Sequence, residues 1–194
     1  MRTTPIDPTI LKGIKADGLL RDGHFAFRSG RHAQWLLDRD RLLADPEFAS
    51  HLGYVLAKHY FVDKIDTVAS PSIWGAGLAQ WIAYFLEPHA KVISATPVDG
   101  ELTIAPALEG HVRGRRVLLV DNIVITGTTL GRFSDRLEAM DATIVGVGTL
   151  WNSADDHVHG HLVHGVLDSM NPAYAPGECP LCAVGPLPAE VVPY

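Results

Sequence analysis

The chain has 194 residues, of which 47% are hydrophobic, and its formal net charge at pH 7 is −6. This size and composition suit one domain with a substantial core, and the negative charge argues against nucleic-acid binding as the main function. No apolar run reaches the roughly 20 residues that a membrane-spanning helix needs, and the amino-terminal segment lacks the apolar core of a signal peptide. We therefore expect a cytoplasmic protein without a nucleic-acid or membrane partner.

Hydrophobic periodicity predicts strands and helices that alternate along the middle of the chain. In chain order, the pattern predicts a helix at 8–17, extended pieces within 23–38, a helix at 45–60, a strand at 67–69, a helix at 77–86, strands at 91–94 and 116–120, a helix at 129–140, and strands at 142–150 and 161–167. Such alternation indicates an α/β fold in which helices flank a central, mostly parallel sheet. The proline-rich segment after Asn171 is expected to be irregular. No linker divides the chain, so we expect a single domain over 1–194 with small appendages at both ends.

The strongest motif lies between residues 117 and 129, where a buried strand ends in an acid and a small-residue turn leads into a helix. The turn, called the phosphate cradle below, comprises Ile125, Thr126, Gly127, Thr128 and Thr129. Free backbone N–H groups at a helix start, threonine hydroxyls and a glycine without a Cβ all favour close approach of a phosphate. Asp121 could accept hydrogen bonds from ribose hydroxyls or help to hold Mg²⁺. The motif is not a Walker A loop, because no Gly-Lys-Ser/Thr follows.

This motif resembles the phosphoribosyl pyrophosphate (PRPP) motif of type I phosphoribosyltransferases. That family usually has two adjacent acids before its phosphate loop, whereas this chain has Asp121-Asn122. The resemblance implies catalytic roles for both residues, with Asp121 at the ribose hydroxyls or the Mg²⁺ and Asn122 beside the ribosyl centre. It also implies Mg²⁺ as cofactor and a hood over the sheet, to which about 1–40 and 168–194 contribute.

Further segments resemble the orotate phosphoribosyltransferase branch of the family. These segments are 25–31, 35–38, 110–117 and the tail 172–182, so the resemblance covers most of 20–185. It implies small-molecule ligands (PRPP and a base or nucleotide), a place in pyrimidine nucleotide metabolism, and a homodimer. It also implies a pyrophosphate and base region made of Arg28, Trp35, Ser72, Trp74 and Gly75. The two tryptophans could stack on a base or pack against the hood.

Three departures from this branch concern its charged groups. The loop 70–75 has no lysine, the stretch 92–112 has no lysine or arginine, and Asn152-Ser153 stands where an Asp-Arg pair is expected. The segment 97–102 is expected to form a short hairpin in place of a cationic mobile loop. Two hypotheses therefore stay open. The chain is either a phosphoribosyltransferase that acts on a base, which need not be orotate, or a catalytically impaired protein that binds a nucleotide or PRPP.

Cys179 and Cys182 form a single Cys-Pro-Leu-Cys segment, which is too few cysteines for a disulfide framework. Four histidines lie before or within the last predicted strand, namely His157, His159, His161 and His164. Two thiolates and two imidazoles could form a zinc site, although a structural role for the cysteines and a solvated loop for the histidines is the alternative. His24 and His32 could act near the site or be incidental.

Overall fold

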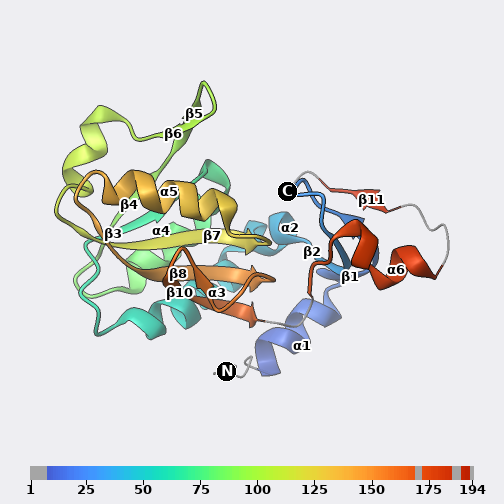
Figure 1. Ribbon diagram of the computed structural model, residues 1–194. Coiled ribbons are helices and arrows are strands. Elements are labelled where there is room, and N and C mark those ends of the chain that lie inside the picture. Colours follow the sequence, from blue (N-terminus) through green and yellow to red (C-terminus); the bar gives the residue numbers. More distant parts are fainter. Residues whose placement is uncertain (1–7, 169–171, 185–188, 193–194) are drawn as a thin grey trace.

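The computed structural model describes residues 8–168, 172–184 and 189–192 and contains three sheets (Figure 1). The central sheet has six strands in the order β4-β3-β7-β8-β10-β9, and its neighbouring strands are parallel except for β9, which is antiparallel to β10. A second sheet has the order β11-β1-β2, and β5 and β6 form a separate hairpin. The predicted α/β class with a central, mostly parallel sheet is thus confirmed.

The helices are α1 (Pro8–Ala16), α2 (Arg39–Ala44), α3 (Pro46–Ala57), α4 (Ala76–Phe85), α5 (Thr128–Glu138) and α6 (Pro180–Ala183). The strands are β1 (Leu20–Ala26), β2 (His32–Leu37), β3 (Thr67–Ser70), β4 (Lys91–Ser94), β5 (Thr96–Val98), β6 (Glu101–Thr103), β7 (Arg116–Val124), β8 (Thr143–Asn152), β9 (His157–Val158), β10 (His161–Asp168) and β11 (Glu190–Val191). In the described part of the chain, no helix is both long and apolar enough to cross a bilayer.

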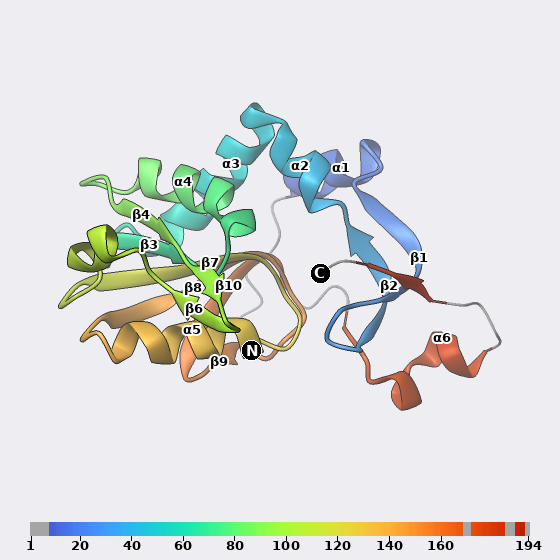
Figure 2. The ribbon, with the colours of Figure 1, turned by 90° about the horizontal axis from the view of Figure 1, so that it is seen from above.

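Helices cover both faces of the central sheet, with α3 and α4 on one face and α5 on the other (Figure 2). On the first face, Leu52 and Ile82 belong to the same core cluster as Leu118 of β7. On the second face, Phe133 of α5 shares a cluster with Leu119 of β7. Consecutive strand residues point to opposite faces, so β7 is buried from both sides, and each fully buried large side chain stabilises the fold by about 1.5–3 kcal/mol. This packing holds the end of β7, which carries the predicted site.

The hood consists of β1, β2 and the carboxyl-terminal segment, and it lies at the end of the sheet toward which β7, β8 and β10 point (Figures 1 and 2). The ring of Phe27 packs edge-on against Trp151 of β8, with 5.7 Å between the centroids. Strand β11 pairs in parallel with β1, and Arg21 forms an ion pair of 2.7 Å with Glu190. Within the ranges expected for the hood, residues 1–7, 169–171, 185–188 and 193–194 lie outside the described part.

Some elements differ from the sequence prediction. Strand β7 continues to Val124 rather than ending at residue 120, because β8 runs on to Asn152 and pairs with it. Helix α2 was not predicted, and the side chain of Asp38 caps it by accepting from the N–H of Arg41 at 3.1 Å. The tail contains the short helix α6 although it was expected to be irregular. The hairpin expected at 97–102 is present as β5 and β6.

Candidate functional site

The phosphate cradle lies where β7 ends and α5 begins. Gly127 is the N-cap of α5 and has a left-handed backbone with φ 74°. A Cβ there would lie 2.6 Å from a methyl group of Val158, so only glycine fits this turn. The N-cap residue Gly127 has no side chain with which to cap α5, and the first turn of the helix has no acid, so its N–H groups and positive dipole end favour an anion. The cradle therefore has the backbone arrangement that binds phosphate at helix starts.

Two hydroxyl groups add polarity to the cradle. The Oγ1 atoms of Thr126 and Thr128 lie 3.0 Å apart, and both residues are exposed. The N–H of Thr128 also points to the Thr126 hydroxyl at 3.4 Å, a long contact that a stronger acceptor would replace. Thr129 is exposed on the first turn of α5, whereas Ile125 is half-buried and anchors the turn to the core. These positions suit a ligand that accepts several hydrogen bonds.

Asp121 lies on β7 three residues before the strand ends, and its Oδ1 accepts a hydrogen bond of 2.8 Å from the N–H of Asn122. Burial raises the pKa of its carboxyl from 3.8 to about 6, although the hydrogen bond from Asn122 and the nearby positive charge of Arg39 act in the opposite direction. Part of the residue is still accessible to solvent. A carboxylate that is costly to ionise and yet reachable is suited to a ligand that supplies hydroxyl donors or a cation.

Arg39 is a residue of the site that the sequence did not reveal. It is the first residue of α2, its side chain is 11% exposed, and its positive charge acts on Asp121. The sequence signal was weak, because an arginine after the strand Leu36-Leu37 looks like an ordinary surface charge. Only the tertiary fold brings this cation close enough to act on the acid that we predicted to bind ribose.

Asn122 connects β7 to the loop 70–75. Its side-chain Nδ2 donates a 2.8 Å hydrogen bond to the Trp74 carbonyl, and its backbone carbonyl accepts 3.1 Å from the Thr149 hydroxyl. The residue is 1% exposed, and its Oδ1 atom has no hydrogen-bond partner among the residues that the structure describes. An ionised aspartate could not donate to the Trp74 carbonyl. The amide therefore positions the loop, which gives the departure from the family pattern a structural role.

The loop between β3 and α4 packs closely against β7. A Cβ on Gly75 would collide with the Ser70 hydroxyl and would lie 3.3 Å from the Val120 carbonyl. The Ser70 hydroxyl donates 2.8 Å to the carbonyl of Ser72, which fixes the turn. Trp74 is 65% exposed, so its ring is not packed into the core. The structure thus brings Ser72, Trp74 and Gly75 to the same edge of the sheet as Asn122.

The two other predicted residues belong to the hood. Arg28 is exposed in the turn between β1 and β2, next to Phe27, whose ring contacts Trp151 near the end of β8. Trp35 is half-buried on β2 and pairs across the strands with Asp22 of β1. Arg28 therefore follows directly on the residue through which the hood contacts β8, and Trp35 lies further along the hairpin.

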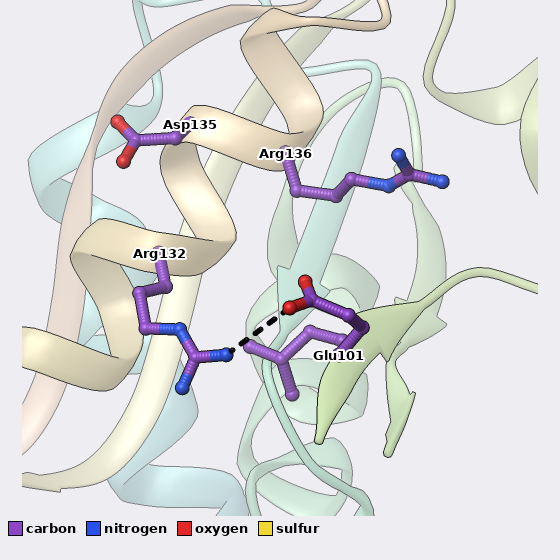
Figure 3. A pocket seen from close by; sticks show the side chains of 5 residues that line it. Glu101, Arg132, Asp135 and Arg136 are labelled. Carbon is purple, nitrogen blue, oxygen red and sulfur yellow. Dashed lines mark ion pairs between the residues drawn. The ribbon is translucent and has the colours of Figure 1, made fainter. Parts of the chain in front are cut away.

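A pocket of about 320 Å³ lies between α5 and the β5–β6 hairpin (Figure 3). It is lined by Glu101, Leu102, Arg132, Asp135 and Arg136. Arg132 donates 2.8 Å to the Gly100 carbonyl and lies 3.8 Å from the Glu101 carboxylate, so it holds the hairpin to α5. No residue of the predicted site lines this pocket, and we do not assign the reaction to it. It shows that the hairpin is docked on the helix that starts at the cradle.

The histidines that could have formed a zinc site with the cysteines lie elsewhere, so that candidate set of ligands is wrong. His161 contacts the Ser134 hydroxyl at 3.0 Å, and His164 stacks on His59 with 4.4 Å between the centroids. The groups near Cys179 and Cys182 come instead from His24 and His32. Proximity in sequence suggested the wrong histidines, because β9 and β10 are part of the central sheet whereas the cysteines lie in the hood.

A helix start shaped for phosphate, with an acid and a cation at the carboxyl edge of a parallel sheet, defines a nucleotide-type binding fold. Residues 38–163 match the phosphoribosyl transferase domain family. The chain is 30% identical to the orotate phosphoribosyltransferase of Chlorobium phaeobacteroides, over 92% of this chain and 91% of the relative. It is 31% identical to that of Thermus thermophilus, over 94% and 99%.

Solved structures agree with these relatives in fold. The orotate phosphoribosyltransferase of Mycobacterium tuberculosis superposes with a TM-score of 0.66 and 17% identity, over 84% of this chain and 96% of that one. The chain belongs to the phosphoribosyltransferase family and is similar to its orotate phosphoribosyltransferase branch. The resemblance inferred from the PRPP motif is thereby confirmed.

Proposed function

We propose that the chain binds PRPP and a nitrogenous base at the carboxyl edge of the central sheet and transfers the phosphoribosyl group to the base. The bond between ribose C1 and the pyrophosphate oxygen breaks, a bond between C1 and a base nitrogen forms, and pyrophosphate leaves. The proton of that nitrogen goes to solvent or to a nearby base. The observation that carries the proposal is the uncapped start of α5 next to Asp121, because it combines a phosphate site with an acceptor for ribose hydroxyls.

Each residue of the edge has a role in this proposal. The cradle binds the 5′-phosphate, Asp121 accepts from the ribose hydroxyls, and the backbone of 70–75 faces the pyrophosphate. Asn122 positions that backbone through its bond to the Trp74 carbonyl. The exposed ring of Trp74 is available to stack on a base. Arg28 and Arg39 supply positive charge from the hood and from α2.

The donor set also fits a magnesium ion. Mg²⁺ in such sites takes one or two carboxylates and completes its shell with water and substrate phosphates. Asp121 offers one carboxylate, and its raised pKa indicates that nearby positive charge compensates its burial only in part. A bound ion would neutralise charge that develops on the leaving pyrophosphate.

A specific observation favours a second candidate, a nucleotide-binding protein with little or no transfer activity. The hairpin that stands in place of a cationic loop contains no lysine or arginine and is held to α5 by Arg132. Loss of one group that stabilises developing charge costs about 3–4 kcal/mol, or roughly 100- to 1000-fold in rate. Arg39 and Arg28 would have to replace that charge for the enzyme to turn over.

One experiment separates the two candidates. Pyrophosphate release is followed with PRPP, Mg²⁺ and a panel of bases that includes orotate, using the wild type, Asp121→Asn and the control Asp156→Asn. Release with at least one base, lost in Asp121→Asn and kept in the control, supports the transferase. No release with any base, together with calorimetric binding of a nucleoside monophosphate, supports the binding protein. If neither PRPP nor a nucleotide binds, the assignment of the cradle is wrong.

Three further expectations belong to this proposal. The base is left open, because Asn152-Ser153 replaces the charged pair expected for orotate, and the panel above decides it. The chain forms a homodimer, which light scattering of the purified protein tests. The whole chain is one domain that works in the cytoplasm. Limited proteolysis tests whether the chain is one domain, and cell fractionation tests whether it is cytoplasmic.

A further inference from the structure

Four side chains of the hood converge outside the phosphoribosyl site. The nitrogen and sulfur atoms of His24, His32, Cys179 and Cys182 all lie within 4.8 Å of one another, and among the described residues no other group of this kind was found. His24 comes from β1, His32 from β2, and the cysteines flank the start of α6. His24 and Cys179 are buried, His32 is half-buried, and Cys182 is exposed. The group therefore joins the amino-terminal hairpin to the carboxyl-terminal tail.

The printed distances within the group lie inside the range of a tetrahedral metal site or within about 0.3 Å of it. With metal–sulfur and metal–nitrogen bonds of about 2.3 Å and about 2.05 Å, ligand atoms of tetrahedral zinc are separated by about 3.3–3.8 Å. Here the two nitrogens, His24 Nε2 and His32 Nδ1, lie 3.0 Å apart. The sulfur–nitrogen distances are 3.2 Å for Cys182 to His32 and 3.5 and 3.6 Å for Cys182 and Cys179 to His24.

Hydrogen bonds alone do not account for this arrangement. The Nε2 atom of His24 faces three partners, namely His32 Nδ1 and both sulfurs. A ring nitrogen has either one N–H or one lone pair, so it forms one good hydrogen bond in the plane of the ring. If a cation occupies the point between the four groups, each group can bind it through a lone pair, and none of them needs a hydrogen atom there. Both cysteines are free thiols in the structure, so a disulfide is not what brings them together.

We propose that His24 Nε2, His32 Nδ1 and the thiolates of Cys179 and Cys182 bind one Zn²⁺ ion. Two thiolates balance the charge of the ion, which suits a partly buried position. The Cys-x-x-Cys spacing is the usual one for zinc. Because the protein supplies all four ligands, the site is structural and leaves no position for a substrate.

The tail is already aligned with the hairpin by contacts around the site. His32 and Tyr174 exchange two backbone hydrogen bonds of 2.8 Å, and the Arg31 guanidinium donates 2.8 Å to the Ala173 carbonyl. These contacts are near the surface, and each contributes only about 0.5–1.5 kcal/mol. A zinc ion would add a far stronger link across 155 residues of sequence, from His24 to Cys179. The zinc would thus fix the hood that carries Arg28 and Trp35.

The test measures zinc in the whole chain, purified without a metal-binding tag. Plasma mass spectrometry is expected to give about one zinc per chain in the wild type. Cys182→Ser is the main variant, because the side chain is exposed and its replacement removes little packing. It is expected to lower zinc affinity by at least about 100-fold, more than the loss of an outer hydrogen-bond partner costs. His157→Asn, an exposed histidine on β9, is the matched control and keeps full zinc content.

A spectroscopic measurement identifies the ligands directly. The Co²⁺-loaded wild type and His157→Asn should show thiolate-to-cobalt charge transfer and the visible bands of a tetrahedral site, and Cys182→Ser and His24→Gln should lose or shift them. Absence of zinc and cobalt binding under reducing conditions would overturn the proposal. So would binding that survives both ligand substitutions, or a Cys179–Cys182 disulfide found by mass spectrometry in the freshly purified protein.

Discussion

Asp121→Asn should stabilise the protein at neutral pH while it weakens ligand binding. The folded state raises the pKa of this carboxyl from 3.8 to about 6, so between these values the folded state binds more protons than the unfolded state. Stability therefore falls as the pH rises through this window. The shift of about two pKa units corresponds to about 3 kcal/mol at pH 7 and above. Asparagine cannot ionise, so the variant avoids this loss and its Oδ1 can still accept from the N–H of Asn122.

Urea unfolding at pH 4, 5, 6 and 7.5 measures the effect. The difference between Asp121→Asn and wild type should be close to zero at pH 4 and should reach about 3 kcal/mol at pH 7.5, or about 6–12 °C in Tm for a chain of this size. Asp156→Asn, at an exposed position, should show no such pH-dependent gain. Calorimetry with PRPP and Mg²⁺ should show weaker binding for Asp121→Asn alone. A variant that is no more stable than wild type at pH 7.5 would refute the assignment of a costly buried charge.

Three further predictions concern the same edge of the sheet. Asn122→Asp should lower the free energy of unfolding by about 3 kcal/mol at pH 8 and by less at pH 5, because a buried charge replaces the donor to the Trp74 carbonyl. Urea unfolding that shows no pH dependence of this difference would contradict the prediction. Gly127→Ala should weaken nucleoside monophosphate binding at least about 10-fold in calorimetry. A positive φ costs an alanine about 1–2 kcal/mol, and its Cβ would collide with Val158. Unchanged affinity would contradict the role of the cradle. Arg39→Met should raise the pKa of Asp121 above its wild-type value, because Arg39 lowers it, and carboxyl-carbon NMR titration measures the shift; an unchanged or lower pKa would remove Arg39 from the site.

The sequence was informative wherever the chemistry is local. The cradle is a continuous strand, turn and helix, so periodicity and residue type were enough to place it. The hairpin at 97–102 was also predictable, because Asp99-Gly100 is a turn pair that tolerates the positive φ of both residues. The end of β7 was less predictable, because its last four residues owe their strand conformation to pairing with β8 rather than to their own pattern.

Features that depend on distant segments could not be predicted. Arg39 acts on Asp121 through the packing of α2, and no spacing rule links two residues so far apart. The cysteines were considered with the histidines nearest in sequence, whereas His24 lies 155 residues from Cys179. Asn122 was interpreted as the loss of an acid, because a sequence cannot show that its amide donates to the carbonyl of Trp74. Each of these needed the tertiary contacts.

The contacts of Asn122 and Arg132 bear on whether the edge of the sheet can support a reaction. In a transferase, cationic and hydrogen-bonding groups must stabilise the negative charge that develops on the pyrophosphate. They do so best when they are already in position before the reaction. Asn122 holds the loop 70–75 in place, and the side chain of Arg39 is largely buried at a helix start, so both are organised before a ligand arrives. By contrast, the exposed Arg132 holds the hairpin to α5 through an ion pair worth less than about 1 kcal/mol and a hydrogen bond to the Gly100 carbonyl worth about 0.5–1.5 kcal/mol. A tie this weak can open at little cost, so the docked hairpin does not itself prevent access to the cradle. The positive charge available at the edge of the sheet therefore decides between a transferase and a binding protein. Arg39 and Arg28 are the residues that would supply this charge.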